Sequence, residues 1–173
     1  MKKKVPFSYY IILTLFLQVF GVFLRGVMVS AVSEEQKNAI LDNCEVIKEN
    51  LRQVQKNDAR ARVFLGGKYE TILSKFITPF NMALVGNNMS NAKLVENQNE
   101  YAGAKALFSD DYVSYQQGLE ELVSFDCKGQ PEAFYEKLVS VREKRRIVYE
   151  DVLKMEKLAT EHVDFVKKTM EKL

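Results

Sequence analysis

The sequence predicts an all-α protein: an N-terminal membrane-spanning or signal helix followed by an elongated antiparallel (up-down-up) three-helix bundle with coiled-coil seams. Three observations support this prediction. Residues 5–24 are apolar apart from three polar side chains. Beyond residue 31, apolar residues recur at spacings of three and four, which is the helical period. The 173 residues include only 8 Gly and 3 Pro, so few positions interrupt a helix.

The N-terminal segment, residues 1–31, is expected to direct export. Lysines at positions 2–4 precede the apolar run, and such residues stay on the cytoplasmic side, so the rest of the chain is expected outside. The run over 5–24 is long enough to cross a membrane, whereas cleaved signal cores span about 7–15 residues. This favours an uncleaved anchor. The alternative is cleavage between Ala31 and Val32, after the small residues of Val-Ser-Ala, which would release a secreted or periplasmic protein.

Composition excludes several classes of function. Lys+Arg is 25 and Asp+Glu is 23, and four of the basic residues but none of the acidic ones lie in residues 1–31, so residues 32–173 carry a net charge of −2. Such a balance gives no case for binding nucleic acid. One His and two Cys are too few for a zinc site, and no acid, base and nucleophile are arranged for catalysis. We therefore expect a non-enzymatic protein with no cofactor, and no small-molecule substrate is evident.

The first helix of the bundle is expected over about 33–85. It opens on Ser-Glu-Glu-Gln at 33–36, which matches a capping box. Gly66-Gly67 should weaken it, and Pro79 should kink or end it. Its predicted seam comprises Ile40, Cys44, Ile47, Leu51, Val54, Asp58, Ala61, Leu65, Ile72 and Phe76.

Two further helices are expected over about 90–126 and 131–173. The second is predicted to be continuous, with a break at Ser109 as the alternative. Its seam comprises Leu94, Gln98, Tyr101, Lys105, Phe108, Tyr112, Tyr115, Leu119 and Leu122. The third seam comprises Phe134, Leu138, Val141, Arg145, Val148, Val152, Met155, Ala159, His162, Val166, Thr169 and Leu173. Short connections at 86–89 and 126–130 force neighbouring helices to run antiparallel.

Cys44 and Cys127 give the sharpest chemical signal. Counted from the turn near Asn88, they lie at heights that differ by about 7 Å at 1.5 Å per residue. An exported chain with an even pair of thiols favours a disulfide, with two free buried cysteines as the alternative. The bond would close a loop of 83 residues and stabilise the fold by about 4 kcal/mol in the chain-entropy model.

Polar residues interrupt the predicted seams at two levels. The same counting places Asp58 and Arg145 about 3 Å apart along the axis, so they are predicted to meet, and it places His162 opposite Gln98. Tyrosines 112 and 115 are the expected neighbours of the first pair. Asp58, Arg145, Gln98 and His162 would form buried polar layers that fix helix register. A ligand-binding polar pocket is the alternative.

A possible basic contact patch comprises Arg60, Arg62, Arg142, Lys144 and Arg146. It would suit an anionic polymer, a lipid head group or an acidic partner. The alternative is a solvated face paired with nearby acids, which is the common role of charge runs on helices.

The leading functional hypothesis is an exported helical bundle that acts by protein–protein contact at the cell envelope, as a spacer, an adhesin or an assembly subunit. It would be held in the cytoplasmic membrane through residues 5–24 and would bind a protein partner or a second copy of itself. A periplasmic holdase-type chaperone and an extracytoplasmic small-ligand sensor are the alternatives.

Overall fold

The computed structural model describes residues 32–89 and 91–171, and within them the protein is all-helical. The chain divides into two units, Met1–Ser33 and Glu34–Leu173, and the second unit is described below. The predicted anchor over 5–24 and the cleavage site after Ala31 lie outside the described residues. No helix of the described part is both long enough and apolar enough to cross a membrane.

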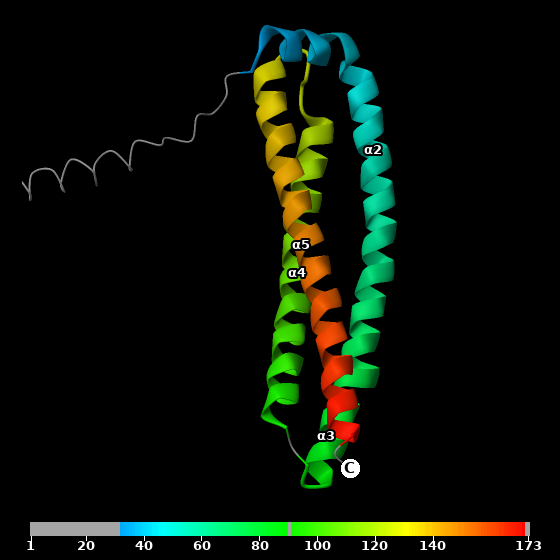
Figure 1. Cartoon of the computed structure of the whole chain (residues 1–173). Coiled ribbons are helices and arrows are strands. Elements are labelled where there is room, and N and C mark those ends of the chain that lie inside the picture. The colour runs from blue at the N-terminus through cyan, green and yellow to red at the C-terminus, as the bar shows by residue number, and fades with distance from the viewer. Residues whose placement is uncertain (1–31, 90, 172–173) are drawn as a thin grey trace, which may run out of the picture. The chain divides into compact units, whose positions relative to one another are not determined.

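The helical unit contains three long helical arms, as predicted. The first arm is composite and consists of α2 (Glu34–Thr71), the π-helical segment η1 (Ile72–Ile77) and α3 (Thr78–Gly86). The second arm is α4 (Ala92–Ser124) and the third is α5 (Pro131–Met170). Figure 1 shows that consecutive arms run in opposite directions, so the first and third arms run parallel to each other.

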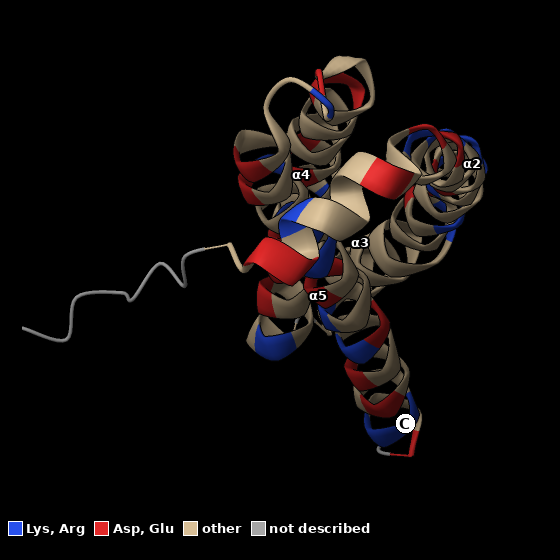
Figure 2. Ribbon diagram, turned by 90° about the horizontal axis from the view of Figure 1, so that it is seen from above, with Lys and Arg blue, Asp and Glu red and all other residues tan. Residues whose placement is uncertain are grey.

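The first arm bends sharply at Asn43, which the sequence did not predict. Asn43 has non-helical dihedrals (φ −116°, ψ 17°), and its side-chain amide donates to the carbonyl of Ala39 at 3.0 Å. Side chains such as Asn compete with helical backbone bonding in this way. The segment before the bend crosses the end of the bundle (Figures 1 and 2), where Lys37 pairs with Glu132 of α5 at 3.2 Å.

The π-helical segment shifts the core register of the first arm by one residue. Phe76, predicted in the seam, is exposed, whereas the next residue, Ile77, is buried. A π-helix bonds residues five apart, and Thr78 N–H accordingly donates to the carbonyl of Leu73. Pro79, which cannot donate, follows at the start of α3, so the helix continues past it to Gly86 rather than ending there.

The turns at the ends of the arms follow from local sequence. Asn88 adopts φ 56°, and Met89 N–H donates to the carbonyl of Leu84, which together form the usual helix-terminating motif. Asn91 caps α4 by accepting from Lys93 N–H at 3.0 Å. α4 then runs through Ser109 without a break, as predicted.

The core of the helical unit consists of two clusters. The first lies toward the α4–α5 connection and comprises Ile40, Cys44, Tyr112, Tyr115, Leu119, Leu122, Cys127, Phe134 and Val141. The second comprises Tyr69, Ile77, Tyr101, Ala104, Phe108, Met155 and Leu158. On α4, the predicted seam positions Gln98 and Lys105 are wrong. Asn97 and Ala104 are buried instead, because positions one residue apart fit the three-four spacing almost equally well.

Candidate functional site

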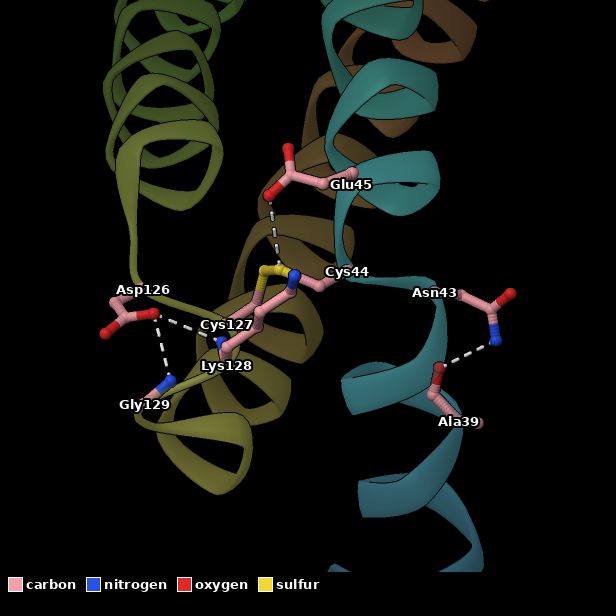
Figure 3. Close-up of a disulfide and its surroundings, with 8 residues drawn as sticks. All are labelled: Ala39, Asn43, Cys44, Glu45, Asp126, Cys127, Lys128 and Gly129. Carbon is pink, nitrogen blue, oxygen red and sulfur yellow. Dashed lines mark hydrogen bonds between the residues drawn. A yellow bond between two sulfur atoms is a disulfide. The ribbon is translucent and has the colours of Figure 1, made fainter.

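Cys44 and Cys127 form a disulfide that joins α2 to the α4–α5 connection (Figure 3). Their Cα atoms are 5.9 Å apart, and both residues are buried in the first core cluster. The connection folds around Asp126, whose Oδ1 accepts from the N–H groups of Lys128 and Gly129 at 3.2 and 2.9 Å. A Cβ at position 129 would come within 2.2 Å of Asp126 Oδ2, so a larger residue there would displace the Asp126 carboxylate from its bonds to the turn. The tight turn thereby positions Cys127 for the bond.

Asp58 and Arg145 meet in the structure. Arg145 Nε donates to Asp58 Oδ2 at 2.8 Å, and a terminal guanidinium nitrogen donates to Oδ1 at 3.0 Å. The buried Tyr115 hydroxyl donates to Asp58 Oδ2 at 2.7 Å, whereas Tyr112 bonds Gln116. The Asp58 carboxylate thus accepts three hydrogen bonds, two from the guanidinium group and one from the tyrosine hydroxyl.

The prediction that this polar layer is buried is wrong for the arginine. The Asp58 side chain is 18% exposed, but that of Arg145 is 58% exposed, because Arg145 reaches the carboxylate from the rim of the bundle. The buried member is Tyr115. Its pKa is raised by burial and by the hydrogen bond to Asp58, so the hydroxyl stays protonated and keeps donating.

His162 is buried but does not meet Gln98, so that predicted pairing is wrong. His162 Nδ1 lies 3.1 Å from Asn97 Oδ1, and the Asn97 amide donates to the carbonyl of Leu158. Gln98 is turned toward the first arm instead, where it bonds Asn81 and Thr78. Since the Asn97 oxygen accepts, Nδ1 of His162 must carry the proton, and the buried Nε2 has no partner among the described residues.

The members of the predicted basic patch have separate environments. Arg146 pairs with Glu143 and Glu150, and Lys144 donates to the carbonyl of Ser114 at 3.2 Å. The guanidinium of Arg62 lies over the Tyr112 ring, 5.0 Å from its centroid, and Arg60 is exposed on α2. Arg142 is also exposed. The five residues therefore do not form a continuous unpaired surface.

Three of these basic residues line one cavity. Its volume is about 520 Å³, and it lies between α2, α4 and α5. Arg62, Arg142 and Arg146 line it together with the Asp58–Arg145 pair. The sequence analysis gave a polar pocket at the level of Asp58 and Arg145 only as an alternative, and it did not predict the arginines and apolar residues that line this cavity.

Asp111 of α4 and Asp151 of α5 form a second feature that the sequence analysis missed. Burial raises the pKa of Asp151 to about 6, and the charge of Asp111 and a hydrogen bond to it add to the shift. Asp151 Oδ2 has no hydrogen-bond partner among the described residues. The pair joins two helices, so spacing within either helix gave no signal for it.

Comparison with protein-family models, with curated proteins and with solved structures finds no match to this chain. Within the described residues, no group of three or more His, Cys, Asp or Glu is placed to hold a metal ion. Any proposal about function therefore depends on the geometry of the chain itself.

Proposed function

We propose that residues 32–173 form an exported, non-enzymatic helical module that acts by protein–protein contact at the cell envelope, with residues 5–24 as its membrane anchor. The observation that carries the proposal is a pair of adjacent apolar side chains in the C-terminal half of α2. Val63 and Phe64 are 74% and 72% exposed, and no described element covers them. Exposed apolar patches of this kind mark interaction surfaces.

The neighbourhood of this pair supports a partner surface. Val63 also lines a groove between α2 and α4, together with Gly66, Lys105 and Phe108. A groove beside two exposed apolar side chains gives a partner helix or loop both an apolar contact and a place to insert a side chain. The partner is a second protein or a second copy of this chain.

Photo-crosslinking in cells tests this surface. A benzophenone amino acid is placed at Phe64 of the full chain, and the control carries it at Lys56, an exposed position two turns earlier on α2. The proposal predicts a product of defined mass from position 64 that is absent from position 56. Equal labelling from both positions, or none from position 64, would contradict it.

The disulfide supports the export part of the proposal, since such bonds persist mainly in oxidising compartments. Alkylation of cells under denaturing conditions reads the state of Cys44 and Cys127 directly. Full protection of both thiols, with an intact N-terminus in the membrane fraction, is the expected result. A chain beginning at Val32 would replace the anchor by a cleaved signal, and reduced thiols in cells would contradict export.

A holdase-type chaperone is the second candidate, and a separate observation favours it. The tip of the bundle around α3 exposes Phe76, Met82 and Val85. A chaperone of this type holds unfolded clients by apolar surface at helix tips. If this role holds, substituting the three residues by Ser should abolish suppression of client aggregation, whereas substituting Phe64 by Ser should leave it unchanged.

A further inference from the structure

The cavity between α2, α4 and α5 lies where the core divides in two. Its wall includes Tyr112 and Tyr115 from the first cluster and Phe108 from the second. Leu65 and Val152 continue the apolar wall. In the described chain, no side chain of α2 between Cys44 and Tyr69 is fully buried, so α2 does not fill this space.

Two of the cationic side chains on this cavity have no carboxylate within ion-pair distance among the described residues. These are Arg62 and Arg142, whereas Arg145 is held by Asp58 and Arg146 by two glutamates. Because the only carboxylate in the lining is already paired, the cavity carries excess positive charge next to an apolar wall.

The two residues that carry these guanidinium groups lie on either side of the Asp58–Arg145 pair along the bundle. Arg62 lies four residues after Asp58, and Arg142 lies three residues before Arg145. Because α2 and α5 run parallel and Asp58 lies level with Arg145, the backbone positions of Arg62 and Arg142 are about 10 Å apart along the axis. The lining therefore offers two cationic positions at different heights, each next to apolar side chains of the same cavity.

We propose that this cavity binds an organic anion with an apolar body, such as a medium-chain carboxylate, with its anionic group on Arg62 or Arg142 and its body against Leu65, Phe108 and Val152. A volume of about 520 Å³ lies within the range of small-molecule sites. Guanidinium groups suit carboxylates, and the apolar wall selects against small hydrophilic anions. This inference is independent of the partner surface proposed at Val63 and Phe64.

The test is photo-affinity labelling of the full chain in lipid nanodiscs with dodecanoic acid that carries a diazirine at the chain end. Labelled peptides are mapped by mass spectrometry. The proposal predicts labels on the cavity-lining segments of α2, α4 and α5, which free dodecanoic acid displaces and dodecanol does not.

Paired variants assign the label to the cavity. Arg62→Gln/Arg142→Gln should weaken labelling about tenfold or more, the loss expected for a charge-assisted hydrogen bond. Arg52→Gln/Arg60→Gln removes the same charge from residues that do not line the cavity and should leave labelling unchanged. Ala61→Phe leaves every arginine in place and puts a ring into the cavity, so it should also block labelling.

Three results would overturn the proposal. One is equal displacement by dodecanol, which would mean that the anion is not recognised. Another is an equal loss in both double arginine variants, which would indicate a general charge effect. The last is full labelling of Ala61→Phe, which would place the ligand elsewhere. Labelling that Phe64→Ser abolishes while Ala61→Phe retains it would assign the ligand to the partner surface instead.

Discussion

Reduction of the Cys44–Cys127 disulfide should loosen α2 from the α4–α5 pair. The bond closes a loop with a sequence separation of 83, for which the chain-entropy model gives about 4 kcal/mol. Few side chains of α2 are fully buried, since only Ile40, Cys44 and Tyr69 are so over its 38 residues, and its other contacts with α4 and α5 are half-buried or polar. The bond is thus expected to provide a large share of the free energy that keeps α2 in place.

The assay is thermal unfolding of the same chain with and without reductant, followed by circular dichroism. A loss of about 4 kcal/mol should lower Tm by on the order of 10–20 °C in a domain of this size. Cys44→Ala/Cys127→Ala is the control, because its Tm should not respond to reductant. Hydrogen exchange should show earlier loss of protection in α2 than in α4.

A shift in Tm of less than about 4 °C on reduction would refute this reasoning, because it would limit the contribution of the bond to about 1 kcal/mol. Equal loss of protection in α2 and α4 would contradict the statement that α2 is held less strongly than α4. The three arms would then unfold as one unit, and α2 would not be the weakly held one.

Three further predictions concern stability. Asp58→Ala leaves the buried Tyr115 hydroxyl without its acceptor and should lower the free energy of unfolding, measured with denaturant, by about 2 kcal/mol. Adding Tyr115→Phe should recover most of this loss. No recovery would mean that the loss does not come from the Tyr115–Asp58 hydrogen bond. Asp151→Asn should stabilise by about 1 kcal/mol at pH 7 but not at pH 4. The folded pKa of about 6 lies above the unfolded value of 3.8, so the unfolded carboxyl ionises while the native one still holds its proton. The penalty therefore grows as pH rises from about 4 to about 6 and is complete above pH 6, and exposure to solvent reduces its size. A gain that is independent of pH would contradict this. Gly103→Ala should stabilise α4 by up to about 1 kcal/mol, because a Cβ at position 103 meets open space. Gly118→Ala should stabilise it less, because a Cβ there would lie 3.3 Å from Val141 Cγ2 of α5. Equal increases in Tm would contradict this difference.

The parts of the fold that depend on counting along regular helices were predictable from the sequence. Straight helices that share a turn have a known rise, so counting predicted the contact between Asp58 and Arg145 and the pairing of Cys44 with Cys127. The errors lie where the backbone departs from that rise. The π-helical segment moved the core position to Ile77, and no feature of the three-four spacing indicates such an insertion.

A different limit explains why His162 was given the wrong partner. Asn97 and Gln98 are neighbours on α4, and the helical period allows either of them at the core position. Both side chains are amides, so their chemistry does not distinguish them either. The choice depends on α5, where the Leu158 carbonyl accepts from the Asn97 side chain. Such a bond between helices is a tertiary property, so a single helix pattern cannot predict it.

Interruptions of the apolar seams are nevertheless informative about the candidate site. On α2, the carboxylate of Asp58 and the small side chain of Ala61 occupy successive seam positions, and on α5 Arg145 replaces an apolar residue at the same level. A seam that carries small and charged residues at one height in two helices cannot fill the space between them. The cavity lies at this height, and both Asp58 and Ala61 line it. The charged seam positions therefore mark where the core is interrupted, and the same interruption creates the space proposed here to hold a ligand.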